Sequence, residues 1–309
     1  MYVEPIIALR FLLYVTLLTS FGLPLFWLYA FDGAKRRSPF LPSITLTQIA
    51  LQLTALVGGC AAIALTIAAM ADVSLTSLDP AVVHTVIFQT PIGAAWQARM
   101  VGLILALGSM LVLRARHGVW QLLATIVGTG VALGSLAWNG HGGAGEGVAG
   151  TVRLSADILH LLASGTWVGA LLAFAILLIA SRTARSNDST ALLASALARF
   201  STIGTIAVVA LAVTGSVNMY LLVGVAHIAD LGTTPYGQLL LVKLGAFAAM
   251  LGLAALNRFY LTVRLKRALV SGEVHAAVIA LRISVGFEAG AAIAILGIVA
   301  WMGTLEPPL

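Results

Sequence analysis

Long apolar stretches separated by short polar segments run through the whole chain. Eight of them reach the roughly 20 residues that a helix needs to cross the hydrocarbon core of a bilayer. They fall at residues 6–31, 44–71, 95–115, 119–138, 154–180, 198–223, 237–262 and 283–303. Because lipid offers no water to satisfy free backbone groups, each stretch is predicted to be helical. The pattern therefore predicts an all-α polytopic membrane protein, a bundle of eight transmembrane helices.

Composition supports this class and leaves little room for a soluble domain. Of the 309 residues, 60% are hydrophobic and 9% are charged, whereas soluble domains carry about 25% charged residues. We therefore expect one integral membrane domain over residues 1–309. The first apolar stretch is too long for the hydrophobic region of a signal peptide and has no basic segment before it, so it is expected to be a span. The single cysteine, Cys60, excludes an intrachain disulfide and a CxxC metal site.

The basic residues are divided unevenly between the two ends of the predicted bundle. Of the 17 Lys and Arg residues, only Arg10, Arg99, Arg153 and Lys243 lie on or toward the end that carries the chain termini. The other end carries Lys35, Arg36, Arg37, Arg114, Arg116, Arg182, Arg185, Arg199, Arg258, Arg264, Lys266, Arg267 and Arg282. By the positive-inside rule this second end is cytoplasmic, and both termini are predicted to lie outside. The net charge of +6 is explained by these loops and does not indicate a nucleic-acid partner.

Polar residues inside the predicted spans form two groups at different depths. The outer group comprises Arg99, Asp157, His160, Asn218 and Lys243. The inner group comprises Gln48, Gln52, Asn257, Arg258 and Glu288. An aspartate at the centre of a membrane helix costs about 2.5–3.5 kcal/mol, so an ionisable residue there is by default a candidate functional residue. Two small-xxx-small patterns, Gly165–Gly169 and Gly286–Gly290, are interpreted as close helix packing.

The outer group contains candidate metal ligands. Asp157 and His160 are three residues apart and share a helix face, which Trp167 extends. Either His160 is a metal ligand oriented by Asp157, or Asp157 pairs with Lys243 or Arg99 and His160 bonds a backbone carbonyl. The residues alone leave both interpretations open.

His141 lies in a glycine-rich segment, NGHGG, that follows the fourth predicted span. Taken alone it is a solvated loop histidine, and together with His160 it would form half of a metal site. Two imidazoles with a thioether or carboxylate suit copper, and Met70, Met219 and Met302 are weak candidates for the soft ligand.

Glu288 is the acidic residue of the inner group. We expect it to pair with Arg258 or Arg282, or to serve as an inner binding position for a cation or proton.

The chain has no GxxxxGK[ST] phosphate loop, no HExxH and no GxSxG motif. We therefore expect neither direct use of ATP nor an enzyme.

Several runs resemble the CopD/PcoD family of copper-resistance proteins of the bacterial inner membrane. They are LSADILHLLASGTWVGALL (154–172), RFSTIGTIAVVALAVTGSVNMYLLVG (199–224), TTPYGQLLLVKLGAFAAMLGLAALNRFYL (233–261) and FEAGAAIAILGIVAWMGTLEPP (287–308). The elbow GHGG (140–143) is similar to the family's GHA-type turn, with glycine in the third position. The resemblance covers nearly the whole chain; it is strongest from His141 onward, with 196–305 the most CopD-like segment, and weakest over 72–95.

The resemblance implies an eight-helix, multi-pass protein of the bacterial inner membrane that takes up copper with a periplasmic CopC-like partner. His141 and His160 match the family's histidines and would bind a copper ion, Cu+ or Cu2+. The family's other recurrent polar positions correspond to Asp157, Trp167, Asn218, Lys243, Asn257, Arg258 and Glu288. A homo-oligomer is compatible with this interpretation. The alternatives are a membrane haem or redox protein, and a copper-binding partner or sensor that transports nothing.

Overall fold

The computed structural model describes residues 2–32, 41–116, 118–139, 147–183, 187–224, 227–271 and 274–306. Within these ranges the chain is helical with no strand, and eight helices are long and apolar enough to cross a membrane. The prediction of an eight-helix, all-α membrane protein is confirmed. The long helices are α1 (Val3–Ala30), α2 (Leu41–Ala71), α4 (Pro91–Arg116), α5 (Val119–Gly134), α6 (Gly147–Thr183), α7 (Asn187–Leu222), α8 (Pro235–Leu256) and α10 (Val274–Met302).

Shorter elements occupy the ends of these spans. Between α2 and α4, where no element was predicted, lie a 3-10 turn, η2 (Leu75–Ser77), and the helix α3 (Pro80–Gln89). Asp79 caps α3 by accepting a hydrogen bond from the Ala81 amide at 2.8 Å. The remaining short elements are η3 (Ser135–Asn139), η5 (Ile228–Gly232), the π turn η6 (Asn257–Leu261) and α9 (Thr262–Ser271).

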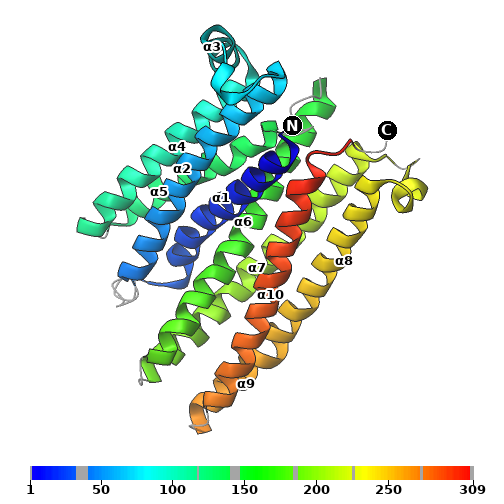
Figure 1. Cartoon of the computed structure of the whole chain (residues 1–309). Helices are drawn as coiled ribbons and strands as arrows, with labels where there is room; N and C mark the ends of the chain where they lie inside the picture. Colours follow the sequence, from blue (N-terminus) through cyan, green and yellow to red (C-terminus); the bar gives the residue numbers. More distant parts are fainter. Residues whose placement is uncertain are drawn as a thin grey trace.

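Helix α1 runs through the middle of the bundle and contacts α2, α5, α6 and α10 (Figure 1). It approaches α6 most closely at glycines. A Cβ atom added to Gly22 would lie 1.8 Å from the carbonyl oxygen of Gly165, and one added to Gly169 would lie 2.3 Å from Gly22 Cα. The Gly165–Gly169 pattern is therefore a packing surface, as predicted. Gly286 and Gly290 face open space within the chain, so for this pattern the packing interpretation is wrong.

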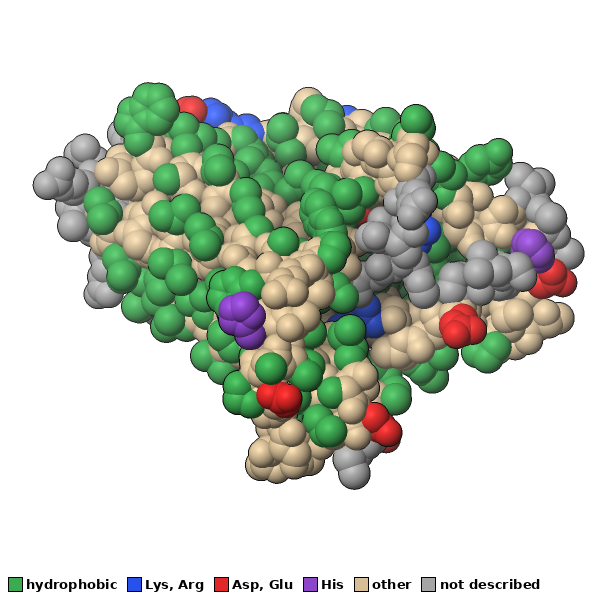
Figure 2. Space-filling view, turned by 90° about the horizontal axis from the view of Figure 1, so that it is seen from above, with side chains coloured by type: hydrophobic (Ala, Val, Ile, Leu, Met, Phe, Trp, Pro, Cys, Tyr) green, Lys and Arg blue, Asp and Glu red, His purple; other side chains and the backbone are tan. Residues whose placement is uncertain are grey.

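Both termini lie at the same end of the bundle, where α3 also lies (Figure 1). Seen from this end, charged side chains are few and scattered among hydrophobic ones (Figure 2). Helix α6 pairs with α7, and α8 pairs with α10. Side chains of α7 and α8 line two cavities between these pairs, and the polar residues of the spans gather there.

Candidate functional site

A first cavity of about 470 Å³ lies between α6, α7, α8 and α10, in the half of the bundle that carries the termini. Its lining is mostly apolar, and its polar and sulfur-containing residues are Tyr14, Arg153, Asp157, His160, Ser164, Trp167, Ser216, Asn218, Met219, Tyr236, Lys243, Met250 and Met302. Four of the five residues of the predicted outer group therefore come together. The fifth, Arg99, is buried elsewhere and donates from Nε to Ser135 Oγ at 2.9 Å.

The antiparallel pair of α6 and α7 positions the acid. Asn218 Nδ2 donates to Asp157 Oδ1 at 2.6 Å. The amide oxygen of Asn218 is buried and has no hydrogen-bond partner, although buried polar atoms are nearly always satisfied. Asp157 has no ion pair, since the one salt bridge among the described residues joins Arg199 to Asp32. The expected pairing of Asp157 with Lys243 or Arg99 is therefore not found.

His160 takes its orientation from the same helix pair. Its Nδ1 atom lies 2.9 Å from Thr214 Oγ1, and the Thr214 hydroxyl lies 2.6 Å from the carbonyl oxygen of Ala210. A hydroxyl has one proton to donate; because it goes to Ala210, the Thr214 oxygen accepts from Nδ1–H. The unprotonated Nε2 lone pair of His160 is then available to a ligand in the cavity. Neither Asp157 nor a backbone carbonyl is the partner of this imidazole.

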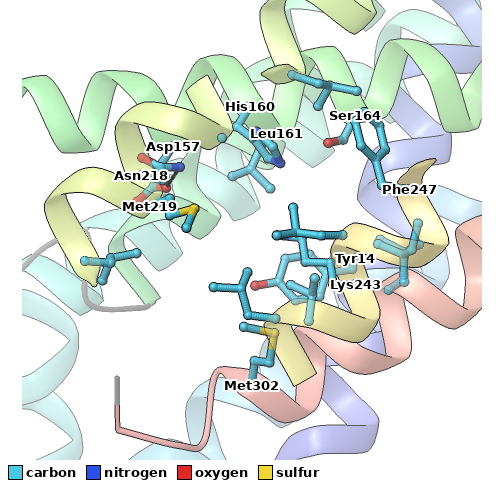
Figure 3. A pocket seen from close by; sticks show the side chains of 18 of the residues that line it. Tyr14, Asp157, His160, Leu161, Ser164, Asn218, Met219, Lys243, Phe247 and Met302 are labelled. Atoms are coloured by element: carbon cyan, nitrogen blue, oxygen red, sulfur yellow. Dashed lines mark hydrogen bonds between the residues drawn. The ribbon is translucent and has the colours of Figure 1, made fainter. Parts of the chain in front are cut away.

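Two of the three methionines considered as soft ligands line the first cavity. Met219 lies beside the Asp157–Asn218 pair, whereas Met302 lies on the opposite wall with Tyr14 and Lys243 (Figure 3). Met70 is 62% exposed and lines a different cavity. His141 lies outside the described residues. The donors in the described part of the site are thus one imidazole, one carboxylate, an amide oxygen and thioethers.

A second cavity of about 570 Å³ lies toward the opposite end of the same helices. Trp167 lines both cavities and is 3% exposed. Its indole packs edge-on against Phe200, with ring centroids 6.0 Å apart, and its Nε1 donates to no atom of the described chain. Trp167 is therefore the side chain that lies between the two polar regions.

The second cavity contains Asn257, Arg258 and Glu288. Asn257, at the start of the π turn, donates from Nδ2 to Glu288 Oε1 at 2.5 Å. The expectation that an arginine pairs with Glu288 is wrong. Arg258 instead binds the Thr205 hydroxyl, and Arg282 Nη2 donates to the carbonyl oxygen of Leu178 at 3.2 Å.

The other two residues of the predicted inner group do not line this cavity. Gln48 donates from Nε2 to the carbonyl oxygen of Ser20 at 2.6 Å, and Gln52 is fully buried one turn further along α2. Both lie on α2, which contributes no residue to the second cavity.

In the part of the chain that the structure describes, no three His, Cys, Asp or Glu residues come together to hold a metal ion. Two residues of the site were missed in the sequence, Thr214 and Tyr14. Thr214 lies one turn from Asn218 on α7, just as His160 lies one turn from Asp157 on α6. If α6 and α7 are taken as antiparallel neighbours and Asp157 is placed opposite Asn218, His160 then lies opposite Thr214.

Comparisons with known proteins agree with this architecture. The signature described as "Copper resistance protein D-like, N-terminal domain" matches residues 1–151, and that described as "Copper resistance protein D" matches residues 194–302. Copper resistance protein D of Pseudomonas syringae pv. tomato is 39% identical over 98% of this chain and 97% of its own length. No solved structure matches the chain.

Two more distant relatives are also membrane or copper proteins. Inner membrane protein YebZ of Escherichia coli (strain K12) is 28% identical over 84% of this chain and 86% of its own length. Copper transport protein CutJ of Bacillus subtilis (strain 168) is 31% identical over 65% of this chain, which covers 36% of that relative. With its eight spans, the chain is a multi-pass protein of the bacterial inner membrane, and it belongs to the copper resistance protein D family.

Proposed function

We propose that this protein moves copper ions across the inner membrane toward the cytoplasm, binding them first in the first cavity. The observation that carries the proposal is the free Nε2 of His160 inside a cavity of about 470 Å³. A neutral imidazole whose other nitrogen is fixed by a hydrogen bond is the usual form of a metal-binding histidine. Imidazole and thioether donors, here His160 and Met219, favour copper over the harder divalent ions.

Transfer requires weak binding at more than one place, and the two cavities supply two polar regions along one path. The carboxylate of Asp157 and the free oxygen of Asn218 attract a cation in the first cavity. Glu288 and Asn257 do the same in the second. Trp167 lies between them, so copper passes when this indole moves aside, and the resting protein does not leak ions.

The proposed orientation places the first cavity on the side from which copper would be received. With the Lys- and Arg-rich end in the cytoplasm, the termini and the first cavity are periplasmic. A periplasmic CopC-like carrier would then deliver copper to His160, and His141, which precedes α6 in the sequence, would supply a second imidazole. The name of one relative, copper transport protein CutJ, supports transport over storage.

The test is copper uptake into proteoliposomes containing the purified full-length protein. His160→Gln keeps the approximate size and polarity of the side chain but removes the imidazole nitrogen whose lone pair would bind the metal, and we expect it to abolish protein-dependent uptake. His275→Gln is the matched control, because His275 is exposed near the start of α10 and far from either cavity. Uptake that is equal in both variants would refute the assignment. Copper binding without uptake in the wild type would make the protein a copper receptor or sensor.

A further inference from the structure

A third cavity, of about 380 Å³, lies between α1, α2 and α4, apart from the two cavities described above. Two arginines line it, Arg10 from α1 and Arg99 from α4, and no aspartate or glutamate does. These are two of the four basic residues predicted from the sequence to lie on or toward the end of the bundle that carries the termini. The copper pathway uses neither of them.

Arg99 is the larger anomaly, because it is a buried charge without a carboxylate. It is 2% exposed, and its hydrogen bonds run from Nε and Nη2 to Ser135, at 2.9 and 3.4 Å. No described residue accepts from Nη1, and no carboxylate of the described residues lies within 4.0 Å of this guanidinium. A guanidinium stays charged in a protein, and a buried charge costs several kcal/mol unless a partner compensates it. The charge therefore needs an anion that can enter the cavity.

Arg10 adds a second guanidinium to the same cavity. Its Nη1 donates to the carbonyl oxygen of Gly303, just past the end of α10. The indole Nε1 of Trp96, also in the lining, is already used, since it donates to Gly59 O at 3.1 Å. The lining thus carries two guanidinium groups of like charge, and a bound anion would attract both.

We propose that this cavity binds an oxyanion of the phosphate class. Guanidinium groups match the oxygens of phosphate by bidentate, charge-assisted hydrogen bonds. Arg10 lies seven residues into α1 and Arg99 eight residues into α4, so both are about 10–12 Å from the helix ends. This depth and the exposed rim at Met70 are accessible to a phospholipid headgroup and to free phosphate.

The remaining walls of the cavity are aliphatic or apolar. They include Ile6, Leu9, Leu13, Ile63 and Ile92. The hydroxyl of Thr66, also in the lining, donates to the carbonyl oxygen of Ala62 at 2.8 Å. Such walls can contact the first carbons of an acyl chain. A phospholipid would therefore contact both the apolar walls and the two arginines, whereas free phosphate would contact only the arginines. The two positive charges also repel copper ions, so Met70, which lines this cavity, is not expected to be a copper ligand.

The experiment uses purified full-length protein in detergent and two probes. Native mass spectrometry follows the binding of added phosphatidylglycerol, with diacylglycerol of the same chains as the phosphate-free comparison. Thermal unfolding with added inorganic phosphate tests the free ion. Arg10→Gln and Arg99→Gln remove one guanidinium each, and Arg264→Gln, at an exposed position of α9 at the opposite end of the bundle, is the control.

We expect phosphatidylglycerol to bind the wild type and Arg264→Gln with the same affinity. Its affinity for each cavity variant should be at least about tenfold lower. Diacylglycerol should not bind. A phosphate-dependent rise in melting temperature without lipid binding would identify the free ion as the occupant. If Arg99→Gln does not fold, the partly exposed Arg10→Gln carries the comparison. Equal binding of both lipids, equal binding by all variants, or binding of neither probe to the wild type would overturn the proposal.

Discussion

Replacing Thr214 by valine tests whether the orientation of His160 supports metal binding. The substitution keeps the shape of a side chain that is 6% exposed, so it opens no cavity. It removes the oxygen that accepts from Nδ1 at 2.9 Å. The imidazole then holds a buried N–H without an acceptor, and the Nε2–H tautomer, which cannot bind a metal through Nε2, becomes comparably stable.

The size of the effect follows from two independent magnitudes. Leaving a buried donor unsatisfied costs about 1–3 kcal/mol, and loss of the residue that orients a liganding histidine lowers metal affinity about 10–100-fold. These agree, since each tenfold change corresponds to about 1.4 kcal/mol. We therefore expect the Kd for copper to rise by about 10–100-fold in Thr214→Val. Thr214→Ser, which restores the hydroxyl, should regain most of the affinity.

The assay is a competition titration of copper against a chelator at fixed pH, with purified protein. Thr54→Val is the matched control, because Thr54 also donates to a carbonyl four residues earlier, at 2.9 Å, but lies on the exposed face of α2. An unchanged Kd in Thr214→Val, combined with lost binding in His160→Ala, would show that another group orients the imidazole. Equal losses of copper affinity in Thr214→Val and Thr54→Val would show that the substitutions act by destabilising the protein and not by changing the orientation of His160.

Three further predictions concern the cavities and the helix packing. Lys243→Met removes a positive charge from the first cavity, and we expect copper to bind about tenfold more tightly in the same titration; weaker binding would refute this role of the charge. Trp167→Ala should join the two cavities and increase copper leak in proteoliposomes, and an unchanged leak would mean that other side chains form the barrier. Gly22→Ala puts a Cβ into the backbone of α6 and should destabilise the protein by about 1–3 kcal/mol in thermal unfolding. Gly286→Ala, which meets nothing within 4 Å, should be neutral, and equal effects would contradict the described crossing of α1 and α6.

Hydropathy was sufficient to predict the eight spans because the bilayer imposes both their length and their backbone hydrogen bonding. Depth along the helices also predicted that Asp157, His160, Asn218 and Lys243 lie at one level. Position around each helix axis was not predictable in the same way. Arg99 has the right depth but turns toward Ser135 and lines the third cavity instead of the first.

Partner assignments failed where charge was taken as the guide. An arginine was expected beside Glu288, but the π turn at Asn257–Leu261 presents the Asn257 amide to it. A π turn shifts the register of a helix by one residue and leaves no hydropathy signal. Thr214 was overlooked because a threonine in a span usually bonds its own backbone, which it also does here.

The most direct test of the account is metal analysis with an absorption spectrum of the detergent-purified protein, wild type beside His160→Ala. We predict about one copper ion per chain in the wild type and its loss in the variant, with the helical content and melting temperature retained. The same copper content in both proteins would contradict the site. Iron with a Soret band in the wild type would contradict the function and indicate a haem protein.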